Sequence, residues 1–187
     1  DLRPDNVLMY TTPVFGGGWD ISAMYTLEDG AKDSEILSAN VNWKTGNWYA
    51  SLAYETQGKG NNPAVGAPAV TGDQDATGIR LGAKWTPGAW MLTAFYQTVG
   101  GITSANDFDV MGIGAGYKMG KNVIKAQYYM NSGEGSENDA TLMAVGWDYK
   151  MSKRTTAYIA YAATDNDLNT NYAVNKGGHG DSYTPGG

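Results

Sequence analysis

The segment at residues 139–161, DATLMAVGWDYKMSKRTTAYIAY, contains the pattern that the whole chain repeats. Alternate positions in its first half hold large apolar or aromatic residues: Met143, Val145, Trp147 and Tyr149. The positions between them hold mainly small or charged residues. After the short connection Met-Ser-Lys-Arg at 151–154, the alternation resumes up to Tyr161. A period of two on both sides of a tight reversal predicts a β-hairpin with one apolar and one mixed face.

Ten segments of the chain carry this alternation: 5–12, 18–27, 35–45, 47–56, 77–86, 89–98, 108–118, 121–131, 140–150 and 154–163. Helical periodicity prevails in none of them, and most are rich in β-branched or aromatic residues. A turn or a loop separates each segment from the next. The sequence therefore predicts an all-β fold in which antiparallel strands run up and down in chain order.

Each predicted strand has an apolar face and a polar face. In the fifth segment the apolar face consists of Ile79, Leu81, Ala83 and Trp85. The polar faces of the strands contain the following residues: Asp20, Ser22, Asn40, Asn42, Lys44, Ser51, Arg80, Lys84, Thr93, Lys118, Lys125 and Gln127. Four glycines share these faces, at 82, 112, 114 and 116, and we expect those at 112–116 to thin the wall or to relieve strand curvature.

Short and long connections alternate along the chain. The short ones lie at 13–18, 45–46, 86–89, 119–120 and 151–153, and the long polar ones at 28–34, 57–76, 99–107, 132–139 and after 163. All the tryptophans lie within a few positions of a short turn, and two tyrosines accompany them: Trp19, Trp43, Trp48, Trp85, Trp90, Trp147, Tyr117 and Tyr149. A rim of tight turns with an aromatic girdle is typical of outer-membrane β-barrels, whose other rim carries long loops.

The composition is compatible with a membrane protein built of strands and disfavours several other classes. A chain of 187 residues suffices for one domain, and the lack of cysteine excludes disulfides and thiolate metal sites. No apolar run reaches the 18 residues of a spanning helix, whereas a barrel strand needs about 9–11 residues and buries every second one. The net charge of -6 argues against a nucleic-acid partner.

Two motifs resemble the Gram-negative general porins of the β-proteobacterial type. The opening of the chain is similar to the family segment R-x-D-N-x-x-x-Y-x-x-P-x-F-x-G, through Arg3, Asp5, Asn6, Tyr10, Pro13, Phe15 and Gly17. The hairpin at 149–161 is similar to Y-x-L-S-K-R-T-x-x-Y-x-x-Y near the family's C-terminus, with Met151 in place of the usual Leu. The order and lengths of the predicted strands between the two motifs also match.

The resemblance implies a transmembrane, antiparallel, up-and-down β-barrel of sixteen strands in the outer membrane of a Gram-negative bacterium. Such barrels are usually homotrimers that let small hydrophilic solutes diffuse passively, surrounded by lipid and lipopolysaccharide. The ten segments would be the sixth to fifteenth strands. Residues 1–187 would then form one porin domain that lacks the first five strands, the constriction loop and the last strand.

The cations on the predicted polar face are candidate pore-lining residues: Arg80, Lys125, Lys84, Lys44 and Lys118. Rings of charge inside a narrow pore select ions at short range. We expect Lys84, Lys44 and Lys118 to lie close to the turn rim. Arg80 and Lys125 are expected nearer the middle of the barrel, so we predict that these two contribute most to ion selectivity.

Two other function classes remain open from the residues alone. A soluble or surface β-rich binding or adhesive module accounts for the alternation, but not for the tryptophans gathered at one rim. An enzyme has little support, because the single histidine, His179, lies in a Gly-rich tail and Gly112-x-Gly114-x-Gly116 lacks the spacing of a dinucleotide fingerprint. We therefore expect a passive channel with no catalytic residues, no cofactor and no metal site.

Overall fold

The computed structural model describes residues 6–27, 34–58, 75–101, 107–135, 137–170 and 172. Arg3 and Asp5 of the opening motif, and His179, lie outside these residues. The described chain forms ten strands: β1 Val7–Thr11, β2 Trp19–Thr26, β3 Ile36–Thr45, β4 Trp48–Gln57, β5 Ala76–Trp85, β6 Trp90–Gly100, β7 Phe108–Met119, β8 Asn122–Gly133, β9 Ala140–Lys150 and β10 Thr156–Asn166.

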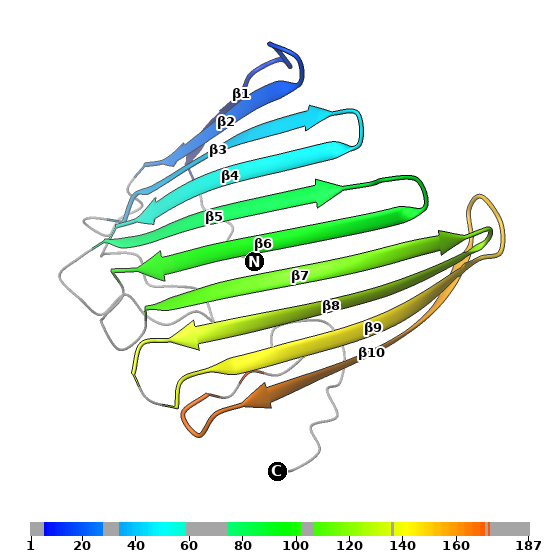
Figure 1. Cartoon of the computed structure of the whole chain (residues 1–187). Coiled ribbons are helices and arrows are strands. Elements are labelled where there is room, and N and C mark those ends of the chain that lie inside the picture. Colours follow the sequence, from blue (N-terminus) through cyan, green and yellow to red (C-terminus); the bar gives the residue numbers. More distant parts are fainter. Residues whose placement is uncertain are drawn as a thin grey trace.

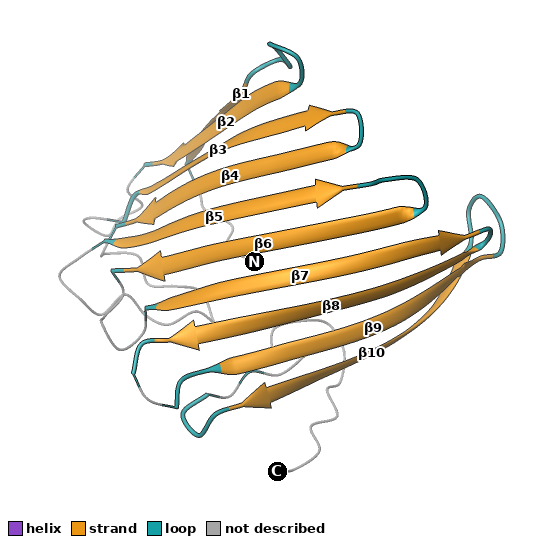
Figure 2. Cartoon of the chain, viewed as in Figure 1, coloured by secondary structure: helices purple, strands orange, loops and turns teal. Residues whose placement is uncertain are grey.

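All ten predicted strands are present, and they form one sheet. Its strand order is the chain order, β1 to β10, and each strand pairs antiparallel with the next (Figures 1 and 2). The predicted all-β, up-and-down antiparallel fold is therefore confirmed. The largest differences lie at strand ends: β10 continues to Asn166 because its ladder with β9 extends to the pair Asn166–Ala140.

The register places like residues opposite one another. Across four neighbouring strands, one row pairs Ile21 with Val41, Val41 with Leu52, and Leu52 with Leu81. The adjacent row, one residue along, contains Asp20, Asn42, Ser51 and Gly82. Because a slip of one residue would move every apolar side chain to the other face, the two faces specify this register.

In the described part of the chain the sheet has almost no core. The buried residues there are Ile36, Ala76, Ala140, Thr26 and the glycines at 58, 112 and 116, and no large side chain is fully buried. Large apolar side chains are instead exposed, for example Leu81 at 51% and Ile113 at 66%. A folded domain in water buries such residues. The sheet is curved (Figure 1), and many side chains of its opposite, polar face are half-buried although no second layer of described residues packs on them.

The two rims of the sheet differ as predicted. The β3–β4, β5–β6, β7–β8 and β9–β10 connections lie together at the right-hand rim of Figure 1, and the strand ends that the long connections join lie at the left. Glycine is required in the first short turn: Gly18 has φ +114°, and a Cβ there would meet the carbonyl of Lys44 on β3. Backbones can approach so closely only without a side chain.

The described residues contain no helix of the length and apolarity needed to cross a membrane.

Candidate functional site

The polar face of the sheet carries all five cations predicted from the sequence. Arg80 and Lys84 lie on β5, Lys44 on β3, Lys118 on β7 and Lys125 on β8, and all five are exposed. Lys44 and Lys118 lie beside short turns, as expected. The amide of Lys44 donates to the carbonyl of Gly18 at 2.8 Å. The cations are thus spread over four strands and do not form one cluster.

Arg80 is held by neutral side chains. Its Nε and Nη2 donate hydrogen bonds to Oε1 of Gln97, directly opposite on β6, at 3.0 and 2.7 Å. The guanidinium carbon lies 5.6 Å from the ring centroid of Phe95, also on β6. Both contacts stabilise a guanidinium without cancelling its charge. Arg80 therefore presents a fixed positive charge to the polar side of the sheet.

Lys125 differs from Arg80 because its charge is paired. Its Nζ donates to Oδ2 of Asp148 on β9 at 2.8 Å, in an ion pair whose side chains are 45% and 25% exposed. The two residues are diagonal neighbours, since Lys125 lies opposite Gly146 and Asp148 lies opposite Val123. The pair is close to neutral when viewed from more than a few ångströms away.

A hydrogen-bonded chain crosses the polar face near the turn rim. Asn42 donates to Asp20 Oδ1 at 2.8 Å, and the hydroxyl of Tyr49 donates to Asn42 Oδ1 at 3.0 Å. The ring of Tyr49 then receives the ammonium of Lys84 at 5.6 Å from its centroid. Four strands, β2 to β5, each contribute one residue to this chain, which fixes the positions of one carboxylate and one ammonium.

Two aromatic residues on the polar face are not among the residues predicted from the sequence. The rings of Phe95 and Tyr129 meet edge to face with centroids 6.2 Å apart, across the intervening strand β7. They can do so because Gly112 lies between them and opposite both. The signal in the sequence is an aromatic residue at a polar-face position, opposite a glycine.

The structure corrects one expectation for the β7 glycines. They do not leave a thin wall, because neighbouring side chains cover them. A Cβ at Gly112 would overlap the ring of Tyr129, and one at Gly114 would lie 2.6 Å from Thr93 Oγ1. At Gly116 the methyl group of Met91 would be 3.2 Å away. These glycines therefore make room for side chains from β6 and β8.

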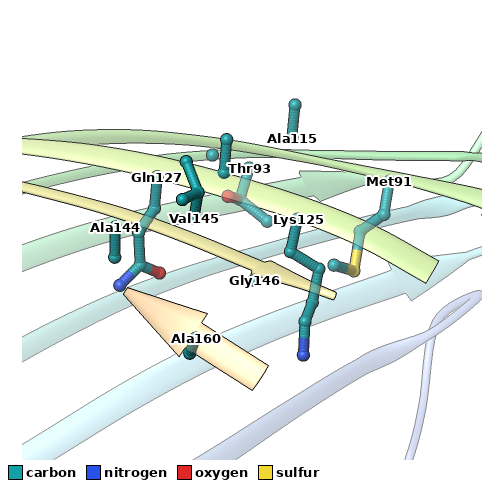
Figure 3. Close-up of a pocket in the computed structure, with 11 residues that line it drawn as sticks. Met91, Thr93, Ala115, Lys125, Gln127, Ala144, Val145, Gly146 and Ala160 are labelled. Carbon is teal, nitrogen blue, oxygen red and sulfur yellow. The ribbon is translucent and has the colours of Figure 1, made fainter. Parts of the chain in front are cut away.

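A shallow hollow lies beside these glycines on the polar face. It has a volume of about 260 Å³, and its lining includes Gly114, Gly146, Lys125, Gln127 and Met91. Figure 3 shows Lys125, Gln127 and Met91 extending to the same side of the sheet, and Ala115 extending to the other. Gly114 on β7 and Gly146 on β9 lie on either side of β8, and their lack of side chains helps to leave this space open.

The aromatic residues of the predicted girdle meet in pairs along the turn rim. Trp48 and Trp85 stack with centroids 5.1 Å apart and planes 12° apart, while Trp19 and Trp43 lie 6.0 Å apart. The remaining pairs are Trp90 with Tyr117 at 4.6 Å and Trp147 with Tyr149 at 6.1 Å. The indole N–H of Trp147 donates to Asn122 at 2.9 Å. Rings with one apolar and one hydrogen-bonded end suit the interface of a bilayer.

The family model of the Gram-negative porins matches residues 1–169. The chain belongs to the Gram-negative porin family. The porin is accordingly a protein of the bacterial outer membrane, and its ten up-and-down strands belong to a porin-type sheet. No curated protein matches the chain.

Solved porin structures share the fold. An anion-selective porin from Comamonas acidovorans is 25% identical with a TM-score of 0.73, covering 88% of this chain and 50% of its own. OmpF of Salmonella typhi, in complex with daunomycin, is 15% identical with a TM-score of 0.65, and the match covers 84% of this chain and 53% of the OmpF chain. OmpT of Vibrio cholerae is 19% identical with a TM-score of 0.61, and the match covers 87% of this chain and 54% of the OmpT chain. This porin chain thus spans about half the length of these structures.

Proposed function

We propose that the intact porin forms a water-filled channel for the passive diffusion of small hydrophilic solutes and ions across the outer membrane. The observation that carries this proposal is the inverted distribution of side chains. The described sheet exposes its apolar face, with Leu52 46% and Leu81 51% exposed, and lines its curved opposite face with charged and amide groups. A closed barrel of this kind has a lipid-facing outside and a wet lumen.

Arg80 is the residue that we propose as the main contributor to ion selectivity. Its charge is held by the neutral Gln97, whereas the charge of Lys125 is balanced by Asp148. An uncompensated cation on a pore wall attracts anions and repels cations at short range. We therefore propose a preference for anions, the property named for the similar porin from Comamonas acidovorans. Lys84, Lys44 and Lys118 would add to this preference at the turn-rim mouth.

The apolar face and the aromatic girdle define the partners in this proposal. Lipid and lipopolysaccharide would cover the apolar face, and the turn-rim tryptophans would lie at the periplasmic interface. The complete protein would be a homotrimer in which each subunit is a sixteen-stranded barrel, and the described residues provide ten of those sixteen strands. The family and the solved structures support a channel and not an enzyme.

A soluble or surface-exposed binding module is the alternative. It would have to cover the apolar face with a second layer, since leaving many large apolar side chains in water is costly. No such layer packs on the face within the described residues. This observation favours the channel.

Reconstitution of the purified full-length porin tests the proposal. In planar bilayers that separate two KCl concentrations, we expect the conductance to rise in steps as channels insert. The sign of the reversal potential should show that chloride passes more easily than potassium. The protein should also require detergent for extraction and migrate as a heat-sensitive oligomer on gels. Recovery of folded protein from the aqueous fraction, or a folded protein that inserts without conducting, would contradict the channel.

A further inference from the structure

Among the described glycines within strands, Gly82 is the one with open space where a side chain would be. It lies on β5 between Ser51 on β4 and Phe95 on β6, its direct neighbours across the two ladders. A Cβ at Gly82 would meet no heavy atom of the described residues within 4 Å. At Gly112, by contrast, the ring of Tyr129 fills the space above the backbone. The space above Gly82 on the polar face is therefore open, next to the position that carries Phe95, and we call this space the Gly82 niche.

Two cations border the same niche. Arg80 and Lys84 lie two residues to either side of Gly82 on the same face of β5. Their side chains lean in opposite directions, because the guanidinium of Arg80 contacts Gln97 and Phe95 on β6 while the ammonium of Lys84 lies over Tyr49 on β4. This divergence leaves the space above Gly82 clear. The niche thus combines an open floor, an aromatic wall and positive charge.

We propose that this niche, formed by Gly82, Ser51, Phe95, Arg80 and Lys84, is a transient binding site for small aromatic carboxylates such as benzoate. The inference deepens the proposed channel function, on which it rests, by naming a class of solute. The carboxylate accepts a charge-assisted hydrogen bond from Arg80. The ring lies above Gly82, where it contacts Phe95 without displacing any side chain.

The aromatic wall distinguishes this site from a simple anion path. An arginine alone attracts acetate and benzoate alike, because their charges are equal. Phe95 adds contact with a ring, and its position is fixed on one side by the guanidinium at 5.6 Å and on another by Tyr129 at 6.2 Å. A ring held in this way needs no rearrangement to receive a flat ligand, which lowers the entropic cost of binding.

The test uses the full-length porin in planar bilayers in KCl. Acetate, cyclohexanecarboxylate or benzoate is added, and the reduction of single-channel KCl current is measured against concentration. We expect benzoate to reduce the current at a concentration roughly three- to tenfold lower than acetate, the effect of one aromatic contact. Cyclohexanecarboxylate should fall between them.

Variants of the niche identify the site. Gly82→Val fills the open floor while Arg80 and Phe95 remain, and Phe95→Leu removes the ring but keeps an apolar side chain. Both should abolish the difference between benzoate and acetate. The matched control is Gly78→Ala on the same face of β5, where a Cβ has no atom nearer than 3.9 Å. This control should retain the preference for benzoate.

The outcomes separate this inference from the proposed function. A porin that conducts KCl but responds equally to benzoate and acetate would overturn the aromatic site and leave the channel intact. A benzoate preference that survives Gly82→Val, or that disappears equally in Gly78→Ala, would also overturn it. A folded, inserted porin without KCl conductance would overturn both proposals.

Discussion

Replacing Asp148 by Asn should make the channel more selective for anions. In the structure the carboxylate of Asp148 lies 2.8 Å from the ammonium of Lys125 and cancels its charge. The substitution keeps the size and hydrogen-bonding capacity of the side chain and removes only the negative charge. Lys125 would then join Arg80 as an uncompensated cation on the pore wall. The sign of the expected effect follows directly from the pairing.

The size of the effect follows from Coulomb's law. An ion that passes about 5 Å from the unmasked charge gains or loses about 0.8 kcal/mol in water, and about 0.5 kcal/mol after screening in 0.1 M salt. This energy raises the local anion concentration about twofold and lowers the local cation concentration by a similar factor. The anion-to-cation permeability ratio should therefore rise roughly two- to fourfold.

Reversal potentials under a KCl gradient measure this ratio. The double variant Lys125→Gln with Asp148→Asn is the matched control, because it removes both charges and should resemble the unmodified channel. Arg80→Gln should lower the anion-to-cation permeability ratio because it removes a cation. Lys125→Gln alone should also lower this ratio, because it leaves the negative charge of Asp148 uncompensated. An unchanged ratio in Asp148→Asn, alongside a lower one in Arg80→Gln, would refute the claim that this ion pair faces the ion path.

The remaining predictions concern stability. Leu52 lies at the middle of the apolar face of β4. Leu52→Arg should lower the free energy of unfolding, measured with denaturant in vesicles, by roughly 2–4 kcal/mol relative to Leu52→Ala, because it moves a charge into hydrocarbon. Equal free energies of unfolding for the two variants would contradict a lipid-facing position. Gly18→Ala should lower the denaturation midpoint more than Gly46→Ala, because only at Gly18 would the methyl group meet backbone atoms. Gly112→Val should be destabilising by about 1–3 kcal/mol through overpacking against Tyr129, and Tyr129→Ala should partly rescue it; strictly additive effects would exclude that contact.

Much of the fold could be predicted from the sequence because the side chains of a barrel strand point alternately to the apolar and the polar face. The alternation through Ile79, Leu81, Ala83 and Trp85 defines the outer face of β5 whatever its neighbours are. Tight turns with glycine at 46 and 120 then make consecutive strands antiparallel neighbours. Local pattern and global topology agree in such a sheet, so strand positions and faces followed from simple counting.

Pairings between side chains could not be predicted in the same way. Lys125 and Asp148 are 23 residues apart, and they meet only because the β8–β9 register makes them diagonal neighbours. Likewise, period two assigns Phe95 to the polar face, but its contacts with Arg80 and Tyr129 depend on rotamers and on the space left by Gly112. The sequence predicted Arg80, and after it Lys125, as the main selectivity residues, but it gave no sign that a neutral side chain holds Arg80 while a carboxylate pairs with Lys125.

The central claim is that successive residues of one strand face lipid and water in turn. Since the chain has no cysteine, single cysteines at Leu81 and Gly82 can each carry a nitroxide spin label in the reconstituted porin. Power-saturation measurements should find the label at 81 more accessible to oxygen, which concentrates in lipid, and the label at 82 more accessible to a water-soluble nickel complex. Equal accessibility to the nickel complex at both positions would contradict a lipid-facing apolar side.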